Sequence, residues 1–567
     1  MKEVVVDVLS KELKVSKKEV ENLVEVPPAD KLGDYSFPCF GLAKEKKKNP
    51  MEIASDLCEK LRTGLPKEIS NVDFKGAYIN FFLDKKVLAK SVLRESSKKG
   101  FGSHNIEKKK VGMEYPAPNT NKNLHLGHLR NIAIGESVTA IVKNAGNKTF
   151  HLNLFNDRGI LISKAMIGYE KFSKGKTPES EKIKPDKFVG DLYVSFSKES
   201  KDDPALEEEA KEKLRLWETG DKETLKLWKK LNNWTYKGMQ ETFDTFGLSK
   251  IDKNYYESDL YGGGEKMIYD GLKKGIFKKR EDGAVIINLE KEKLGEKVLL
   301  RSDGTSVYIT QDIYLADKKI KDFKLDSSYH VVGNDQDYHF KVLFLILDRL
   351  GMKKDWKHLS YGMIRLPTGK MKGREGQTIS ADDMIAQTKE LAKKGILFRS
   401  PDMKGKKELE KNSLIISLAA IKYALLKVDV KKGIVFDPKE ALSFEGDTGP
   451  YLLYSYARAN SILKKVKKKR EILPKSVIPE DLKDSEIRLL KKIGQFPDIS
   501  LDAYKSLSPH VVANYSFELA KTFNEFYHAE SVLGSSEEGF RLELVSRFKD
   551  TLEKALGLLG IETLDRM

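Results

Sequence analysis

The chain has 567 residues, of which 40% are hydrophobic and 33% are charged, and its formal net charge at neutral pH is +17. This length and composition predict a soluble protein of three or four globular domains, and the basic excess favours a polyanionic partner without requiring one. The two cysteines lack a zinc-binding spacing, the N-terminus lacks a basic-then-apolar signal, and the longest apolar run, near residues 414–426, is interrupted by Lys422. A zinc site, a secretory signal and a membrane span are therefore excluded, and a cytoplasmic location is expected.

Residues 1–100 are predicted to form a separate small α/β module. Helical patterns cover residues 2–13, 36–44 and 49–61, and residues 72–83 have the alternating, aromatic-rich pattern of a strand. Cys39 and Cys58 are interpreted as free thiols of the core of this module in a reducing compartment.

A strand, a helix and a second strand are predicted between residues 111 and 154. Apolar residues alternate over 111–115, recur at helical spacing over 126–142, and alternate again over 150–154. Pro116 and Pro118 end the first strand. Because ligands bind beyond the carboxyl ends of the strands in such βαβ units, the loop 116–124 is expected to line a site.

Two histidines mark the start of the predicted helix. His125 and His128 lie three residues apart, hence on one face, where unpaired backbone N–H groups and the positive end of the helix dipole favour an anion. Gly127 leaves room for the close approach of a phosphate or a flat ring. This spacing alone occurs on many helices without a catalytic role, so the flanking residues decide its meaning.

The flanking stretch EYPAPNTNKNLHLGHLR, residues 114–130, contains HLGH, which resembles the HIGH signature of class I aminoacyl-tRNA synthetases, and as a whole it resembles the arginyl-tRNA synthetases. LGDYSFPCFGLAK and GAYINFFL near the N-terminus, and GDTGPYLLYSYAR and LLGIETLDRM near the C-terminus, are also similar to this family. The resemblance implies an α/β N-terminal added domain at 1–100 that contacts the tRNA elbow, a class I Rossmann-type catalytic domain with a parallel sheet at 101–395, and an all-α anticodon-binding bundle at 396–567.

Charge-rich helical sequence over about residues 170–260 looks like the insertion between the two halves of the class I fold. Its tryptophans, Trp217, Trp228 and Trp234, are interpreted as core anchors, with stacking on RNA as the alternative. Arg158 and Gly159 in FNDRGI follow the second strand and are expected to border the site. That segment often reads GDWG in arginyl enzymes, so NDRG marks a subgroup.

The substrate side chain would be held by carboxylate and hydroxyl groups. A planar guanidinium is best matched by a carboxylate that accepts two parallel hydrogen bonds. Tyr308 and Asp312 lie four residues apart, on one face if their segment is helical. The resemblance implies that Tyr308, Asp312 and Gln336 bind the arginine side chain, while Glu114 and Asn119 hold its amino and carboxylate ends.

The ATP site would combine three segments of the chain. Gly333, Asp335 and His339 in VVGNDQDYH fit a class I pattern near the ribose of ATP. The segment GKMKGREG, residues 369–376, occupies the place of the KMSKS signature, with Gly373 where that signature has its second lysine. In many arginyl enzymes a lysine just before HIGH substitutes, and Lys122 stands there. The resemblance thus implies an ATP-binding set of His125, Gly127, His128, Gly333, Asp335, His339, Lys370 and Met371, and a catalytic set of His125, His128, Lys122, Lys370 and Arg374.

From about residue 400 the sequence is nearly all helical. Segments 412–428, 450–471, 509–529 and 541–560 each show apolar residues at helical spacing and are joined by Pro, Gly and Ser clusters, which predicts a helical bundle. The run KKVKKKR, residues 464–470, is interpreted as a solvated helix end.

The resemblance implies ATP-dependent ligation of L-arginine to tRNA(Arg) through an arginyl-adenylate, with transfer to the terminal 2′-hydroxyl and activation that needs bound tRNA. ATP is then a substrate, and Mg²⁺ is held by its phosphates. No prosthetic group, protein metal cage, membrane partner or DNA partner is expected. The family resemblance also implies a monomer. Three alternatives remain: another amino-acid specificity, a catalytically inactive paralogue that binds tRNA, favoured only by Gly373, and a free-standing nucleotidylyltransferase, which leaves both end domains unexplained.

Overall fold

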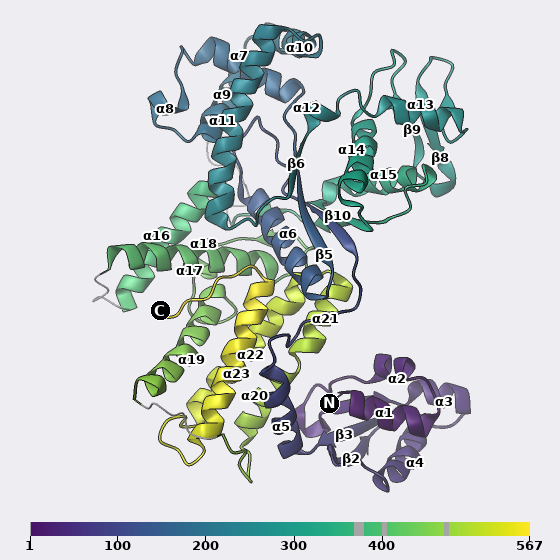
Figure 1. The fold of residues 1–567 in the computed structure, drawn as a ribbon, viewed down its shortest axis with the longest axis vertical. Helices are drawn as coiled ribbons and strands as arrows, with labels where there is room; N and C mark the ends of the chain where they lie inside the picture. Colours follow the sequence, from purple (N-terminus) through teal and green to yellow (C-terminus); the bar gives the residue numbers. More distant parts are fainter. Residues whose placement is uncertain (1, 368–378, 400–404, 470–475) are drawn as a thin grey trace.

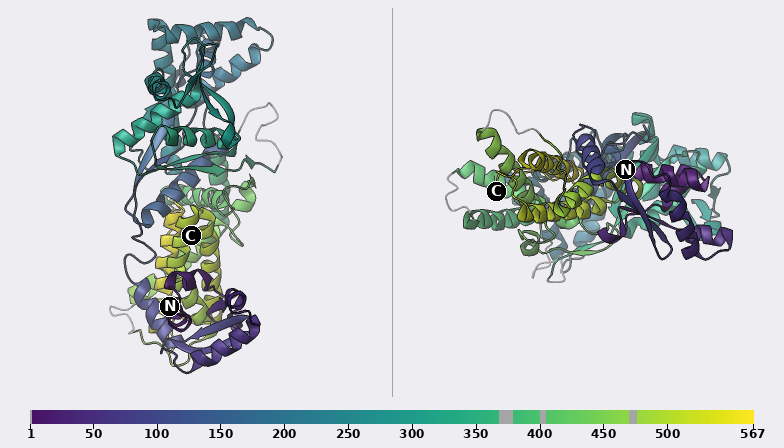
Figure 2. Two further views of the ribbon diagram at one scale, coloured as in Figure 1. Left: turned by 90° about the vertical axis from the view of Figure 1, so that its right-hand side faces the viewer. Right: turned by 90° about the horizontal axis from the view of Figure 1, so that it is seen from below.

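A computed structural model describes residues 2–367, 379–399, 405–469 and 476–567 of the chain (Figure 1). The molecule is elongated, with the N-terminal module and a helical insertion at opposite ends of the long axis and the parallel sheet and C-terminal helices between them (Figure 2). Within these described ranges, no helix has the length and apolar character needed to cross a bilayer.

The N-terminal module is a three-stranded antiparallel sheet of order β1-β3-β2 with helices around it. Cys39 and Cys58 are both free and buried in its core, as predicted. In chain order the elements are α1 (Lys2–Leu13), α2 (Lys17–Leu23), β1 (Tyr35–Pro38), α3 (Phe40–Lys46), α4 (Pro50–Arg62), β2 (Ile69–Lys75), β3 (Tyr78–Leu83) and α5 (Lys85–Ser96).

Two sequence predictions in this module are wrong. The segment 36–44 is not one helix, because its first residues form β1, which pairs with β3. Pro38 explains the difference, since a residue that precedes proline avoids the helical region and Phe37 is therefore extended. The segment 72–83 is not one strand but a hairpin of β2 and β3, which reverses at Gly76 with φ of +59°.

The central sheet has five parallel strands in the order β11-β10-β4-β5-β6. The predicted βαβ unit is confirmed as β4 (Lys110–Glu114), α6 (Leu126–Asn144) and β5 (Lys148–Phe155), and the remaining strands are β6 (Lys253–Tyr256), β10 (Ser327–Gly333) and β11 (Asp355–Tyr361). The chain goes from β4 outward to β5 and β6 and then returns to β10 on the other side of β4. The carboxyl ends of β4 and β10 therefore form the topological switch point, where ligands bind in open α/β sheets.

Alternation along β4 divides its side chains between two faces of the sheet. Val111 and Met113 belong to the apolar cluster that includes α6, whereas a side chain at Gly112 would meet Leu325 and Leu152 on the other face. Glu114 lies on that second face, toward α14 (Tyr308–Phe323), which packs beside α15 (Asp337–Arg349). The acid at the end of β4 is thus directed to the cavity described below.

The packing of α6 on β4 leaves no room for a methyl group at Gly135. An added Cβ would lie 2.4 Å from Cγ of Tyr115, whose ring stacks on His151 with centroids 4.0 Å apart. We expect Gly135→Ala to lower the thermal midpoint of the protein, because overpacking costs about 1–3 kcal/mol and helix propensity returns only about 1 kcal/mol. Circular dichroism melting checks this. Gly557→Ala is the control, since its Cβ meets no atom within 4 Å and the midpoint should not fall.

Two excursions leave the sheet on the side opposite to the N-terminal module (Figure 1). The first, between β5 and β6, is the predicted helical insertion, with Trp228 and Trp234 packed against its apolar cluster and Trp217 in edge contact with Trp228. The second, between β6 and α14, carries a small antiparallel sheet that the sequence patterns did not reveal. The elements are α7 (Ile160–Phe172), α8 (Pro178–Glu181), α9 (Pro185–Glu199), α10 (Ala205–Glu218) and α11 (Lys222–Phe246), then α12 (Glu257–Leu260), α13 (Glu265–Lys273), β7 (Lys278–Lys279), β8 (Val285–Leu289) and β9 (Gly295–Leu300).

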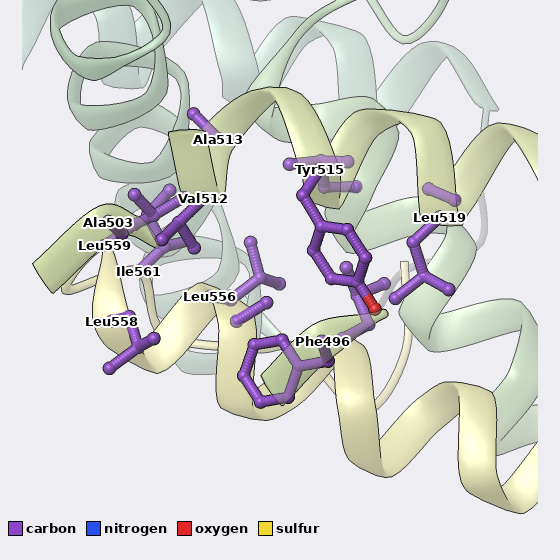
Figure 3. Packing of buried hydrophobic residues seen from close by; sticks show 14 of the residues in the cluster. Phe496, Ala503, Val512, Ala513, Tyr515, Leu519, Leu556, Leu558, Leu559 and Ile561 are labelled. Carbon is purple, nitrogen blue, oxygen red and sulfur yellow. The ribbon is translucent and has the colours of Figure 1, made fainter. Parts of the chain in front are cut away.

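The C-terminal part is helical, as predicted. Buried side chains of its last helices interlock in one apolar core, in which Phe496, Tyr515 and Leu556 lie together (Figure 3). From residue 364 to the C-terminus the elements are β12 (Ile364–Arg365), α16 (Ala381–Arg399), α17 (Lys406–Leu426), β13 (Ile434–Val435), which pairs with β12, α18 (Pro438–Ala441), α19 (Gly449–Lys469), α20 (Asp484–Gly494), α21 (Phe496–Ser506), α22 (Pro509–Ala529) and α23 (Glu538–Leu558).

Candidate active site

A cavity of about 290 Å³ lies at the carboxyl ends of the central strands, at the switch point between β4 and β10. Its lining comes from the ends of β4, β5 and β10, from the first residue of α12, and from α14 and α15. All five residues predicted to bind arginine line it, although they come from three separate parts of the sequence: Glu114, Asn119, Tyr308, Asp312 and Gln336.

Glu114 is held by two buried cationic or polar partners. One carboxylate oxygen is paired with Nζ of Lys319 from α14, and the other lies 3.0 Å from Nδ1 of His330 from β10. Burial alone would raise the pKa of Glu114, but Lys319 and His330 lower it to about 2. Glu114 is therefore ionised, and its negative charge is largely balanced within the protein.

Asp312 and Tyr308 lie on one face of α14, as the spacing predicted. Oδ2 of Asp312 is 2.7 Å from Nε2 of His339, and burial raises the pKa of this carboxyl group above its ordinary value in spite of that bond. Tyr308 opens the helix, is about half exposed, and has its ring centroid 5.3 Å from that of His339. The pair thus presents a carboxylate and a phenol at the cavity.

Glu257, which the sequence patterns did not single out, is a third carboxylate of the cavity lining. It follows β6 directly, and the pairing of Phe155 with Tyr256 places it opposite Asn156 at the end of β5. Burial raises the pKa of Glu257 to about 7. No side chain in the described ranges forms a hydrogen bond or ion pair with it. The only local signal for a role of Glu257 is that an acidic residue directly follows a strand. This signal could not be recognised because β6 itself was not predicted.

His125 and His128 are locked in one tautomer by the backbone of the helix start. The N–H of Gly127 donates to Nδ1 of His125 at 3.1 Å, and the N–H of His125 donates to Nδ1 of His128 at 3.0 Å. A nitrogen that accepts cannot carry the proton of a neutral imidazole, so each ring has its N–H at Nε2. Burial lowers the pKa of His125 to about 4 and that of His128 well below its ordinary value, so both rings are neutral donors at pH 7.

Lys122 lies in the loop just before these histidines, and burial lowers its pKa. In the described part of the chain no carboxylate pairs with it. Its backbone is close to the helical insertion, since a Cβ at Gly190 of α9 would lie 3.5 Å from Cα of Lys122. The loop therefore presents an uncompensated ammonium group near the two imidazoles.

The VVGNDQDYH residues follow β10 at the same edge of the sheet. Asp335 is exposed and accepts a hydrogen bond from Nε2 of Gln336 at 3.0 Å, and Gly333 is the last residue of β10. His339, which the motif placed near the ATP ribose, lines the cavity and contacts Asp312. The structure thus gives His339 a partner, Asp312, from the set of residues predicted to bind arginine.

Lys370, Met371, Gly373 and Arg374 lie outside the described residues. Further along the chain, Ala381 lies beside the loop that precedes His125, where its N–H donates to the carbonyl of Leu124 at 2.9 Å. Among the described residues, no three His, Cys, Asp or Glu side chains gather in a way that would hold a metal ion.

Arg158 does not line the cavity, although the sequence placed it at the border of the site. Its guanidinium carbon lies 3.8 Å from the ring centroid of Tyr261 and 5.1 Å from that of Trp217, and Glu218 pairs with it at 2.7 Å. Gly159, with φ of +97°, forms the N-cap of α7 and is not part of the lining either. The NDRG segment therefore anchors the insertion through Arg158.

Comparisons with known families cover nearly the whole chain. Residues 89–437 match the family model of the class I tRNA synthetase (R) catalytic domain, residues 452–567 match the DALR anticodon binding domain, and residues 1–83 match the arginyl tRNA synthetase N-terminal domain. An arginine–tRNA ligase of Treponema denticola is 43% identical over 96% of this chain and 94% of its own length. One of Bacteroides fragilis is 39% identical over 94% of each chain.

Comparison with solved structures agrees with these family matches. The arginyl-tRNA synthetase of Thermus thermophilus superposes with a TM-score of 0.83 at 27% identity, covering 100% of this chain and 99% of that one. A methionyl-tRNA synthetase of Mycobacterium tuberculosis shares the fold, with a TM-score of 0.50 at 11% identity over 80% of this chain and 90% of that one.

Proposed function

Because the chain belongs to the arginyl-tRNA synthetase family and joins L-arginine to tRNA(Arg) at the expense of ATP, we propose that the cavity between β4 and β10 is its arginine site. Membership in this family sets aside another amino-acid specificity, an inactive paralogue and a free-standing nucleotidylyltransferase. The observation that carries the proposal is the pair of carboxyl groups, Asp312 and Glu257, whose pKa values are raised by burial in one cavity. A bound cation stabilises the ionised form of two such buried carboxyl groups, and a guanidinium can bridge them.

In this proposal the guanidinium lies toward α14 and α12. Asp312 and Glu257 accept its N–H groups, Tyr308 covers it at the mouth of the cavity, and His339 orients Asp312. Glu114, Asn119 and Gln336 complete the arginine site, with Glu114 acting as a fixed acceptor whose charge Lys319 already balances. The amino and carboxylate ends of arginine then point to the loop that leads into α6.

The ATP phosphates would lie at the N-terminus of α6. A carboxylate oxygen of arginine attacks the α-phosphorus, the bond to the bridging oxygen of pyrophosphate breaks, and no covalent intermediate with the protein forms. The Nε2–H groups of His125 and His128 donate to the phosphates, Gly127 permits close approach, and Lys122 supplies the positive charge that pyrophosphate needs as it leaves. By the family resemblance, Lys370, Met371, Arg374, Gly333 and Asp335 add further contacts to ATP.

We propose finer properties on the same basis. Mg²⁺ is bound through the phosphates of ATP, arginine is activated only with tRNA bound, and transfer is to the terminal 2′-hydroxyl. The N-terminal module, residues 1–100, contacts the tRNA elbow and residues 396–567 the anticodon, which the net charge of +17 supports. The protein acts as a monomer in the cytoplasm and binds no DNA.

The pH dependence of arginine binding tests the site. Glu257 has a pKa of about 7 and binds a guanidinium only when ionised, so its ionised fraction rises about tenfold from about pH 6 to about pH 8. We expect the KM for arginine in tRNA charging to fall by about this factor over the same range. The Glu257→Gln enzyme should have a higher KM at pH 8 and little pH dependence.

Asp259→Asn provides the matched control. Asp259 lies two residues after Glu257, is exposed, and is not part of the cavity lining, so its loss should leave the KM profile unchanged. A pH-dependent KM that persists in Glu257→Gln would place another group at the guanidinium and contradict this assignment.

A further inference from the structure

Asp157 is a buried carboxylate beside the cavity that the proposed arginine site does not use. It lies two residues after the end of β5, is 1% exposed, and is not part of the lining of that cavity. Burying a carboxylate is costly unless hydrogen-bond donors surround it. The donors around Asp157 therefore identify the parts of the chain that it holds together.

The carboxylate of Asp157 binds the start of α12. Its Oδ1 accepts from the backbone N–H of Ser258 at 2.8 Å, and its Oδ2 accepts from the hydroxyl of Ser258 at 2.8 Å and from the hydroxyl of Tyr236 at 3.0 Å. Tyr256, the N-cap residue of α12, provides no side-chain acceptor of its own. Asp157 thus supplies, from the end of β5, an acceptor that the first turn of α12 lacks.

Glu257 lies between two fixed points of the backbone. Before it, Tyr256 pairs with Phe155 in the parallel ladder of β5 and β6, and after it Ser258 is bound by Asp157. In the described ranges no side chain forms a hydrogen bond or ion pair with Glu257 itself. The place of its carboxyl group in the cavity lining therefore depends on the backbone on either side, and so on Asp157.

Asp157 is in turn fixed by the helical insertion. Its backbone carbonyl accepts from Nε1 of Trp228 at 2.6 Å and from Nδ2 of Asn232 at 3.2 Å. Both residues belong to α11, as does Tyr236, whose hydroxyl donates to the carboxylate. Three side chains of one helix thus connect the insertion to the residue that holds the start of α12.

We propose that Asp157 is a positioning residue that holds Glu257 in place for the guanidinium of arginine, and that α11 fixes this arrangement through Asp157. The inference rests on the proposed arginine site. Asp157 does not touch the substrate and acts on Glu257 through Ser258. Its loss therefore impairs the binding of arginine and leaves the binding of ATP, whose phosphates are placed at α6, unaffected.

The KM values for arginine and for ATP in tRNA charging separate this role from a general loss of structure. They are measured at about pH 8, where Glu257 is largely ionised. We expect Asp157→Ala to raise the KM for arginine about tenfold, the scale of one lost hydrogen bond to a charged group, with the KM for ATP unchanged. Asp157→Asn should stay close to the wild-type values, because its amide oxygen still accepts from the N–H of Ser258.

Asp252→Asn is the matched control. The carboxylate of Asp252 also accepts from a backbone N–H of β5, that of His151 at 2.8 Å, but it lies just before the amino end of β6 and does not line the cavity. Both KM values should therefore be unchanged in this variant.

The double variant Asp157→Ala/Glu257→Gln tests whether the two residues act together. Its KM for arginine should equal that of Glu257→Gln alone, because residues that act through one another are not additive. Effects that multiply, an equal rise in the KM for ATP, or an unchanged KM for arginine in Asp157→Ala overturns the positioning role.

Ser258→Ala replaces Asp157→Ala in the same measurements if circular dichroism shows that Asp157→Ala does not fold. Only the hydroxyl donor is then lost, so the expected rise in the KM for arginine is about threefold, and no rise overturns the proposal. A KM for arginine that Glu257→Gln leaves unchanged would instead contradict the arginine site itself, an outcome distinct from failure of the Asp157 contact alone.

Discussion

Replacing either histidine of the HLGH sequence by asparagine is expected to slow arginyl-adenylate formation about a hundred- to a thousandfold, the usual cost of losing one donor to the transition state. The prediction follows from the tautomers that the backbone imposes. Asparagine places Oδ1 near the position of Nδ1, so His125→Asn still accepts from Gly127 and His128→Asn still accepts from the N–H of His125. What asparagine lacks is the donor at Nε2.

Glutamine at the same positions keeps the donor that asparagine lacks and loses the acceptor that asparagine keeps. Its longer side chain places an N–H donor near the position of Nε2 but leaves the backbone N–H groups without their acceptor. His125→Gln should therefore keep more activity than His125→Asn and be the less stable protein, because asparagine is a good N-cap and glutamine is not.

ATP–pyrophosphate exchange with arginine and tRNA measures the rate, and thermal unfolding measures stability. Because His125 has a pKa of about 4 and is neutral in the assay, the comparison tests hydrogen-bond donation rather than charge. Asparagine variants that exchange pyrophosphate at the wild-type rate would rule out the proposed role of Nε2.

Lys122→Ala is the second substitution with a large expected effect. In the described ranges this ammonium group has no carboxylate partner, so its removal breaks no ion pair and acts on the charge that develops on pyrophosphate. We expect pyrophosphate exchange to fall about a hundred- to a thousandfold, mainly in kcat, with the melting temperature unchanged. Lys122→Arg should recover part of the activity because it keeps the charge.

Lys143→Ala serves as the control for a simple loss of positive charge. Lys143 is an exposed lysine in the last turn of α6, at the end of that helix remote from Lys122, and its removal should leave exchange unchanged. An equal effect of the two substitutions, or none at Lys122, would assign the stabilising cation to another residue, with Lys370 and Arg374 next to be tested.

Elements whose signals are local could be predicted from the sequence alone. The strand, helix and strand around HLGH, the helices of the insertion and the C-terminal helices all follow from apolar spacing within twenty residues or so, and family-specific motifs along the chain implied the activity. Short-range backbone preferences also explain the errors, since Pro38 makes β1 extended and Gly76 divides the predicted strand into a hairpin.

The assembly of the cavity depends on contacts between residues far apart in the sequence. His330 contacts Glu114 across 216 residues of sequence, and Lys319 reaches the same carboxylate from α14. Glu257 became recognisable only when β5 and β6 were paired. The physical reason is that local periodicity depends on the next few residues, whereas the burial and charge that tune a pKa depend on neighbours brought together by strand pairing. The sequence therefore identified the chemistry, and the fold identified the partners of each group.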